Sequence, residues 1–262
     1  MKSRPRHDKY SLVGVERTVR TLDVFDGASS LALVDIARAA KMSEATTLRY
    51  VSSLAEHGLL EREDDTGRYR LGLALFRLGQ RALRVNDPRK IALPVMEGLL
   101  RRFDETVNLG LRHRDELILI EALESTRSIR KGATVGDRDH WHASGLGKAL
   151  LAALPAEEAR ALLRQHPRPA LTERTLVRVD DLLAHFELIR ARGFAVDDEE
   201  SEDGLRCVGA AIRDHRGIPR FALSISGPAN RFDPARILEA GEGMAAAAAR
   251  ISAALGYAAE EV

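Results

Sequence analysis

Three short segments in the second half of the chain carry groups that could bind a ligand. The first, Trp141–Ala149, places Gly145 and Gly147 where a predicted helix begins. Unpaired backbone N–H groups and the positive end of the helix dipole make such a position suited to a carboxylate or a phosphate. An ordinary capped helix with Ser144 as the N-cap residue explains the same pattern, and it is the simpler interpretation of this segment alone.

The second segment, Val196–Cys207, contains six carboxylates just ahead of a predicted strand. Clustered acids can bind hard cations, but this run lacks the alternating ligands and central glycine of a calcium loop, and a solvated loop is the alternative. Cys207 has no partnering motif, which is typical of a buried small residue. In the third segment, Ser224 and Ser226 face the same side of a predicted strand. Two inward-facing hydroxyls need either protein partners or a polar ligand.

The sequence motifs of common enzyme classes are absent. There is no nucleophile elbow, zinc-spaced histidine pair, Walker-type phosphate loop or dinucleotide-binding fingerprint. Asp197 and Cys207 have no assignable base or oxyanion donor. We therefore predict binding without turnover, with no cofactor and no metal. The alternative from another class is an enzyme that metabolises a small acid and carries a DNA-binding head.

Composition predicts two domains in a reducing compartment. The chain has 262 residues, 45% of them hydrophobic, and one cysteine, which together favour a cytoplasmic protein without disulfides. The basic start is not followed by the apolar core of a signal peptide, and no apolar run approaches the roughly 18 residues of a membrane span. Residues 1–90 hold 17 Lys and Arg against 12 Asp and Glu, whereas the remainder is net acidic. Such an asymmetry suits a protein that presents its first domain to DNA.

The stretch Leu33–Leu71 has the pattern of a winged helix-turn-helix. A first helix with apolar residues at helical spacing leads to a turn at 41–42, and Ser43 then stands where an N-cap residue belongs. After Gly58, two short strands at 59–62 and 69–71 are joined by a polar turn. We expect the second helix to enter a DNA major groove. Its expected buried side consists of Leu48, Val51, Leu54 and Ala55.

The opposite side of this second helix carries short polar side chains and one cation. We expect Arg49 to contact a base or a phosphate, and Thr46 and Thr47 to fix the helix on the DNA backbone. Arg68 is expected on the wing near a phosphate. The predicted contact residues for double-stranded operator DNA are Ser43, Thr46, Thr47, Arg49, Tyr50 and Arg68.

The remaining elements predict an α+β chain in four parts. These are a disordered basic arm at 1–9, a winged helix-turn-helix domain at 10–72, a linker helix at 73–87 and an effector-binding domain at 88–262. Within 10–72, a helix over 12–26 should support the DNA-facing helices through its apolar residues Val15, Val19, Leu22, Val24 and Phe25. The last domain is expected to be an antiparallel sheet flanked by helices. Its predicted helices cover 93–103, 145–154, 157–165, 180–192 and 234–255, and its strands 107–112, 117–122, 128–131, 206–212 and 221–226.

This order of parts resembles the IclR family of bacterial transcription regulators. The resemblance runs from about Tyr10 to Tyr257, and its most specific motifs are HASGLGKALLA, VDDEESEDGLRCVGAAI and ALSISGP at 142–152, 196–212 and 222–228. It implies a winged helix-turn-helix, a helical linker and a C-terminal effector domain related to the GAF fold. The three motifs are most similar to those of the family members that control isocitrate-lyase and allantoin-pathway genes and respond to glyoxylate or pyruvate.

The resemblance also implies a ligand pocket. In such relatives two backbone N–H groups hold the effector carboxylate, and by motif position they fall on Gly145 and Leu146. The first aspartate of DDEE, the cysteine after GLR and both serines of SISGP complete that pocket, here Asp197, Cys207, Ser224 and Ser226. Leu146 stands where relatives can have alanine, and family members that respond to aromatic acids share the scaffold. A repressor acting as a dimer or a dimer of dimers is expected, with copies meeting through residues 12–26 and the linker.

Overall fold

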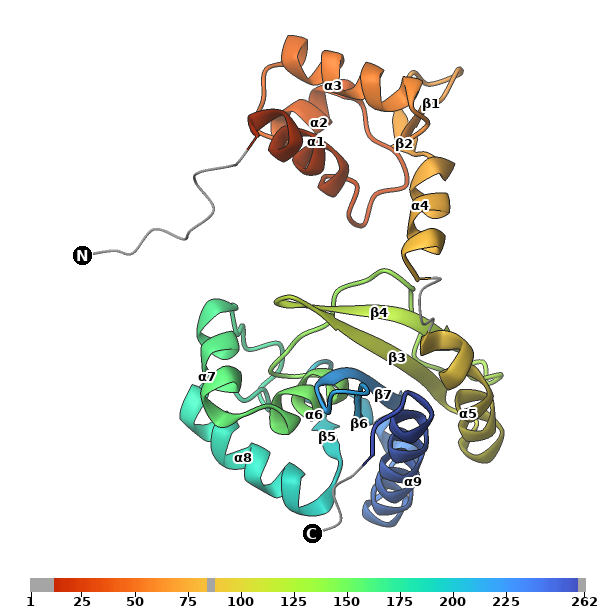
Figure 1. Ribbon diagram of the computed structural model, residues 1–262, viewed down its shortest axis with the longest axis vertical. Coiled ribbons are helices and arrows are strands. Elements are labelled where there is room, and N and C mark those ends of the chain that lie inside the picture. The colour runs from red at the N-terminus through yellow and green to blue at the C-terminus, as the bar shows by residue number, and fades with distance from the viewer. Residues whose placement is uncertain (1–11, 84–87, 259–262) are drawn as a thin grey trace, which may run out of the picture. The chain divides into compact units, whose positions relative to one another are not determined.

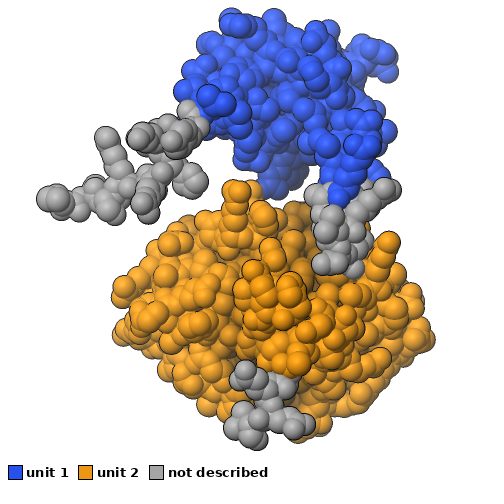
Figure 2. All heavy atoms as spheres, in the orientation of Figure 1, with its two compact units in different colours: residues 1–86 blue, residues 87–262 orange. Residues whose placement is uncertain are grey.

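The computed structural model describes residues 12–83 and 88–258. The chain divides into two compact units, residues 1–86 and 87–262 (Figure 2). The predicted arm at 1–9 and the end of the predicted linker at 84–87 lie outside the described residues. Among the residues that are described, no helix is long and apolar enough to cross a membrane.

Unit 1 is a three-helix core with a small antiparallel hairpin, followed by one further helix (Figure 1). Its core is formed by Phe25, Ile36, Val51, Leu54, Leu60 and Tyr69. The predicted helix-turn-helix with a wing is confirmed. The elements are α1 Val13–Asp23, α2 Leu33–Ala39, α3 Glu44–Glu56, β1 Leu60–Arg62, β2 Tyr69–Leu71 and α4 Leu73–Leu83.

Two predicted burial patterns in unit 1 are wrong. Of the apolar residues expected to pack the 12–26 segment on the DNA-facing helices, Leu22, Val24 and Phe25 join the core, whereas Val15 and Val19 are 58% and 50% exposed. On α3, Leu48 is 46% exposed while its neighbour Thr47 is fully buried. The buried stripe of α3 follows Thr47, Val51 and Leu54, at i, i+4 and i+7, and this helical phase turns Leu48 outward.

Unit 2 is a five-stranded antiparallel sheet with helices on both faces, as the α+β prediction required. The strand order is β4-β3-β7-β6-β5. Helices α5 and α9 pack on one face, and α6, α7 and α8 on the other (Figure 1). The elements are α5 Pro88–Phe103, β3 Thr106–His113, β4 Glu116–Leu123, α6 Gly145–Ala153, α7 Ala156–Gln165, α8 Val179–Arg192, β5 Ala195–Asp198, β6 Leu205–Arg213, β7 Pro219–Pro228, the 3-10 turn Ala229–Arg231 and α9 Pro234–Ala254.

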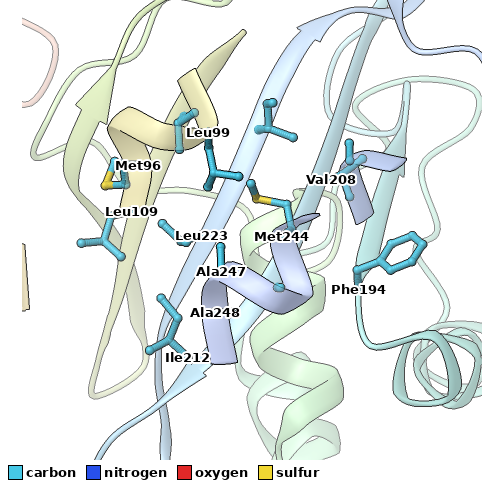
Figure 3. Close-up of a cluster of buried hydrophobic side chains, with 14 of the residues drawn as sticks. Met96, Leu99, Leu109, Phe194, Val208, Ile212, Leu223, Met244, Ala247 and Ala248 are labelled. Atoms are coloured by element: carbon cyan, nitrogen blue, oxygen red, sulfur yellow. The ribbon is translucent and has the colours of Figure 1, made fainter. Parts of the chain in front are cut away.

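The face of the sheet under α5 and α9 is closed by an apolar cluster. Figure 3 shows Met96 and Leu99 of α5 and Met244 of α9 above Leu109 and Leu223 of the sheet. These strand residues alternate with residues that face α6, because successive side chains of a strand point to opposite sides. This packing holds the strands in register and so positions the polar residues of the other face.

Three predicted boundaries in unit 2 need correction. Helix α5 begins at Pro88 rather than near residue 93, because proline is tolerated in the first turn of a helix, where its missing N–H is not needed. Residues 128–131 form no strand. Strand β5 at Ala195–Asp198, which was not predicted, pairs with β6 and gives the start of the acidic segment a fixed place at the edge of the sheet.

Candidate effector pocket and DNA-binding face

A row of polar side chains crosses the sheet of unit 2. Ser224 of β7 pairs with Asn108 of β3, and Ser226 of β7 pairs with Cys207 of β6, which pairs in turn with Asp197 of β5. Residues paired in this way lie side by side on the same face of a sheet. Their alternating neighbours belong to the apolar cluster under α5 and α9, so the polar row faces α6. All five side chains are buried.

Glycines allow the start of α6 to lie directly on this row. A Cβ atom at Gly209 of β6 would lie 2.5 Å from the carbonyl oxygen of Gly145, and one at Gly145 would lie 3.3 Å from Cβ of Cys207. A Cβ atom at Gly147 would lie 2.6 Å from the carbonyl oxygen of Trp141. A side chain at Gly145 or Gly209 would push α6 away from β6, whereas one at Gly147 would meet the backbone of the segment just before the helix. Gly145 and Gly209 therefore bring the helix start against the strand, and Gly147 allows the close approach of the preceding segment.

Ser144 is the N-cap residue of α6, as predicted. Its hydroxyl oxygen accepts a hydrogen bond from the N–H of Gly147 at 3.0 Å. Helix geometry offers no carbonyl acceptor for the N–H groups of Gly145 and Leu146 in the first turn. The capped helix and the anion-binding helix start, two alternatives at the sequence level, are thus compatible in one structure.

A cavity of about 340 Å³ lies between the polar row and the start of α6. Its volume falls within the range usual for small-molecule sites. Sequence reasoning missed other residues in its lining, among them Asn108, Lys131 and Asp139. All six residues predicted for the effector pocket line it: Gly145, Leu146, Asp197, Cys207, Ser224 and Ser226.

The Asp197 carboxylate shapes the loop that forms one wall of the cavity. It is fully buried and accepts hydrogen bonds from the backbone N–H groups of Glu200 and Ser201, at 2.8 and 3.2 Å, and from the Ser201 hydroxyl. Each carboxylate oxygen can accept two hydrogen bonds. Asp197 therefore holds the acidic segment as a turn at the wall of the cavity.

The thiol of Cys207 is held in its protonated form. Burial, together with the negative charge of Asp197, raises the pKa of the Cys207 thiol well above its usual value. A protonated thiol is a hydrogen-bond donor and a poor nucleophile. This chemistry suits a binding residue rather than a catalytic one.

Ionised side chains from two separate segments meet at the cavity. Lys131, from the segment that follows β4, donates a hydrogen bond to Glu202 of the β5–β6 loop at 2.7 Å. Burial acts to lower the pKa of Lys131, but the hydrogen bond and charge of Glu202 outweigh it and raise that pKa. Asp139 also lines the cavity, and burial raises the pKa of its carboxyl. The cavity lining therefore combines a paired cation with the carboxyl groups of Asp139, Asp197 and Glu202.

A buried ion pair connects α6 to the same loop. Lys148 is fully buried, and its ammonium group donates to the Val196 carbonyl at 2.7 Å and to the Glu200 carboxylate. Glu200 donates its backbone N–H to Asp197. The pair thus ties the helix whose first turn faces the cavity to the loop that carries Asp197. A lysine within the apolar run GKALLA is the sequence signal that could have indicated it.

A second cavity, of about 670 Å³, lies between the ends of α6 and α8 and the β6–β7 turn. Arg190 and Arg213 line it, and they donate to the carbonyl groups of Ala152 and Ala153 at the end of α6. These arginines cap a helix C-terminus. The cavity contains none of the residues predicted to bind an effector.

In unit 1, Arg49 lies on the exposed face of α3. Ser43 caps the helix: its hydroxyl accepts from the N–H of Thr46 at 3.3 Å and donates to the Thr46 hydroxyl at 2.9 Å. Ser52, three residues after Arg49, is exposed on the same face and was not predicted. This face presents a cation flanked by small polar groups.

The expected DNA contact by Thr47 is wrong. Its side chain is fully buried, and its hydroxyl donates to the carbonyl of Ser43 at 3.0 Å. A threonine can occupy a helix core when its hydroxyl bonds the preceding turn in this way. The prediction grouped Thr47 with the other polar residues of the helix, but the helical repeat places it on the buried side with Val51 and Leu54.

Two other predicted DNA contacts are partly engaged within the protein. Tyr50 is half-buried, and its hydroxyl lies beside Gly14 of α1. Arg68 donates to the carbonyl and hydroxyl oxygens of Ser30 at 2.8 and 3.1 Å, which braces the base of the wing. Arg62 of β1 is exposed and lies next to Gly67 at the tip of the hairpin. Sequence reasoning did not single out Arg62.

Comparison with known proteins agrees with this architecture. Residues 14–64 match the model of the IclR helix-turn-helix domain, and residues 80–253 match that of the bacterial transcriptional regulator IclR C-terminal domain. The chain is similar to the HTH-type transcriptional repressor AllR of Escherichia coli, with 35% identity over 245 residues covering 92% of this chain and 90% of the relative.

Solved structures show the same likeness. The crystal structure of the Thermotoga maritima IclR has a TM-score of 0.73 and 32% identity, covering 93% of this chain and 98% of that one. An IclR homologue of Microbacterium hydrocarbonoxydans in complex with 4-hydroxybenzoate has a TM-score of 0.79 and 28% identity, covering 92% and 98%. KdgR, IclR and AllR of Escherichia coli, three relatives of this chain, are named as transcriptional regulators or repressors. The chain belongs to the IclR family of ligand-responsive, DNA-binding transcriptional regulators.

Proposed function

We propose that unit 2 senses a small monocarboxylic acid and that glyoxylate and pyruvate are the first candidates. The observation that carries this proposal is the cavity of about 340 Å³, which collects Gly145, Leu146, Cys207 and Ser226 from separate segments of the chain. The free N–H groups of α6 and the positive end of its dipole suit a carboxylate, and the serine hydroxyls suit the adjoining oxygen.

The charges around the cavity favour an acid with a single negative charge. Its lining cations include Lys131 and Arg138, and these pair with Glu202 and Glu116 at 2.7 and 2.9 Å. Asp139 and Asp197 add negative charge to the walls. A second ligand carboxylate would therefore meet repulsion within the described part of the cavity.

An aromatic acid is the second candidate. The solved relative with 4-hydroxybenzoate has the same fold, and this cavity has an apolar wall formed by Leu119, Leu146 and Leu205. The Leu146 side chain packs against Gly110 of β3. A flat ring could lie against this wall while its carboxylate meets α6.

Thermal unfolding of the full-length protein with a panel of acids tests the effector proposal. The panel contains glyoxylate, pyruvate, other oxo acids and hydroxybenzoates. A ligand at 100 times its dissociation constant adds about 2.7 kcal/mol to the stability of the state that binds it. If hydroxybenzoates alone stabilise the protein, the aromatic alternative replaces the proposal. If no acid does so, the pocket assignment fails.

Ser226→Ala sharpens this test. It removes a buried hydroxyl from the cavity and should weaken binding of the active acid about tenfold. The matched control is Ser252→Ala, which removes an equally buried hydroxyl on α9, where it bonds Ala248 and Arg213. Equal loss of affinity in both variants would contradict the assigned site.

We propose that unit 1 binds operator DNA with α3 in the major groove and Arg49 as the main contact. Fragments selected from genomic DNA by the protein itself supply the probe. Arg49→Ala should weaken binding about tenfold or more at moderate salt. The control Arg164→Ala removes an exposed arginine from α7 of unit 2 and should have no effect. Unchanged affinity in Arg49→Ala would show that the recognition surface is misassigned.

We further propose that the protein acts as a dimer or a dimer of dimers, as a repressor in the cytoplasm, where the chromosome lies. Exposed apolar side chains on α1 and α4 support self-association: Leu12, Val13, Val15 and Val19, and Leu73, Phe76 and Leu78 are each at least half exposed. Light scattering after size-exclusion chromatography should show an even number of subunits. Val15→Glu combined with Phe76→Glu should lower that number, and a monomeric wild type would overturn this proposal.

Regulation then requires that the acid binds more tightly to one arrangement of the DNA-binding units than to another. The printed name of the relative AllR is that of a repressor. A transcription assay with the selected DNA fragment gives the sign of the effect, and activation by the protein without ligand would contradict repression.

A further inference from the structure

Asn108 stands in the polar row with a hydrogen-bonding capacity that the protein does not use. The residue is 7% exposed and lines the cavity. Its amide nitrogen donates to the hydroxyl oxygens of Ser224 and Ser226, both at the long distance of 3.4 Å. Its amide oxygen, Oδ1, is buried without a hydrogen-bond partner in the described structure. A buried acceptor of this kind is uncommon and unfavourable.

The surroundings of Asn108 leave room for a ligand to meet this amide. The residues paired with it across the sheet are the small Ala122 and Ser224. Next to Ser224 on the far side, Gly209 admits the start of α6, so the N–H groups proposed to bind the carboxylate lie near the same end of the polar row. The terminal torsion of asparagine is soft, so the amide can turn toward a donor in the cavity at low cost.

We propose that the effector carries a hydroxyl group beside its carboxylate and that this hydroxyl donates its hydrogen to Oδ1 of Asn108. The proposal rests on the proposed function, in which the carboxylate lies at the start of α6. The class comprises 2-hydroxy and 3-hydroxy acids and also the hydrated form of an aldehyde acid such as glyoxylate. A ketone such as pyruvate has only acceptor oxygens and leaves Oδ1 unpaired.

The other polar groups of the cavity also favour a ligand that carries a hydroxyl donor. Asp139, Asp197 and Glu202 present acceptor oxygens to its lining. Its donors include the N–H groups of α6, which suit the ligand carboxylate, and the side chains of Lys131 and Arg138, which are paired with Glu202 and Glu116. A ligand hydroxyl that donates its hydrogen can therefore be accepted by a carboxylate oxygen of the lining as well as by Oδ1 of Asn108.

Pairs of acids that differ by one hydroxyl test this inference on the full-length protein. The pairs are glycolate with acetate and lactate with propionate, and pyruvate and glyoxylate complete the set. Binding is followed by calorimetry and by the fluorescence of Trp141, the single tryptophan, which is buried beside α6. The hydroxy acid of each pair should bind about tenfold more tightly than its partner, and glyoxylate more tightly than pyruvate.

Variants of Asn108 test whether this residue, rather than another pocket residue, causes the preference for a hydroxy acid. Asn108→Leu should reduce the ratio of affinities within each pair to about one, with the affinity for the acid without a hydroxyl changed by less than about threefold. Asn108→Asp keeps the acceptor oxygens and should retain the hydroxyl preference even if its charge weakens all acids. The control Thr134→Val removes a hydroxyl elsewhere in the cavity lining and should leave the ratio unchanged.

The outcomes are distinguishable. Equal affinity for both members of each pair in the wild type overturns this inference while the proposed carboxylate site stands. Binding of no acid overturns both. A hydroxyl preference that survives in Asn108→Leu overturns the role of Asn108, and if that variant does not fold, loss of the preference in Asn108→Asp overturns it as well.

Discussion

The two faces of the sheet in unit 2 are built on different principles. The face under α5 and α9 is closed by apolar residues such as Leu109, Leu223 and Met244. The face under α6 to α8 also has an apolar cluster, but it includes a buried ion pair, a polar row and a cavity. Burial of apolar side chains on the first face stabilises the domain. This stabilisation offsets the free-energy cost of the buried polar groups on the second face, where a ligand can meet them.

Buried polar groups without partners show the same asymmetry. Five buried side-chain atoms have no hydrogen-bond partner among the described residues, and four of them belong to the side of the sheet that bears α6: Oδ1 of Asn108, Nε2 of His166 and of His185, and Oε2 of Glu200. The fifth, Oδ2 of Asp214, lies in the turn between β6 and β7. Unsatisfied polar groups lower stability, and proteins keep them where function needs them. Three substitutions test whether the two faces differ in this way, with urea unfolding followed by Trp141, which reports on unit 2.

Lys148→Met should have the largest effect. It leaves Glu200 buried without its cation and should lower the free energy of unfolding by about 3–5 kcal/mol near neutral pH. Burial already raises the pKa of Glu200, so in this variant the carboxyl can take up a proton, and the loss should be smaller at pH 5. The double variant Lys148→Met/Glu200→Leu should regain part of the loss. If it does not, the ion pair is not the cause.

Leu223→Ala probes the apolar face and should cost about 3 kcal/mol, because the side chain is fully buried. Its expected consequence differs from that of Ser226→Ala. At temperatures where the variant is folded, its affinity for an acid should stay within about twofold of the wild type. A large loss of affinity would show that the two faces are not independent.

His185 should make the stability of unit 2 depend on pH. Burial, with a contribution from the charge of Lys148, lowers the pKa of His185 from 6.5 to about 4. The unfolded chain therefore binds a proton that the folded protein excludes, and stability falls as the pH drops from about 6.5 toward 4. At pH 5 this amounts to about 1 kcal/mol, because solvent screens part of the effect at a half-buried site.

The loss on going from pH 7.5 to pH 5 should be smaller in His185→Leu by about that amount. The control Leu182→Val removes one methylene from a buried position on the same helix. It should lower stability equally at both pH values, so that its curve runs parallel to that of the wild type. An unchanged pH dependence in His185→Leu would rule out this titration as the source.

The apolar periodicity and the turn residues predicted most elements of both units. They also indicated Ser43 and Ser144 as N-cap residues, because a cap depends on a side chain and the backbone only three residues away. It was harder to predict which residues of a helix face the core. Thr47 is buried and Leu48 is exposed, the reverse of the prediction. A buried threonine can donate its hydroxyl hydrogen to a carbonyl of its own helix, and the residue types alone do not reveal this.

The sequence by itself determined the two-domain organisation, the α+β class and the segments that line the pocket. These follow from local patterns and from motifs of recognisable spacing. Only the tertiary structure decided that Asn108 lines the cavity and that Lys148 is tied to the loop that forms its wall. Asn108 meets Ser224 through the register of β3 and β7, and Lys148 meets Glu200 through the packing of α6 on the sheet. Such pairings join residues 116 and 52 positions apart, and they depend on strand order and close approach at glycines, which no local pattern specifies.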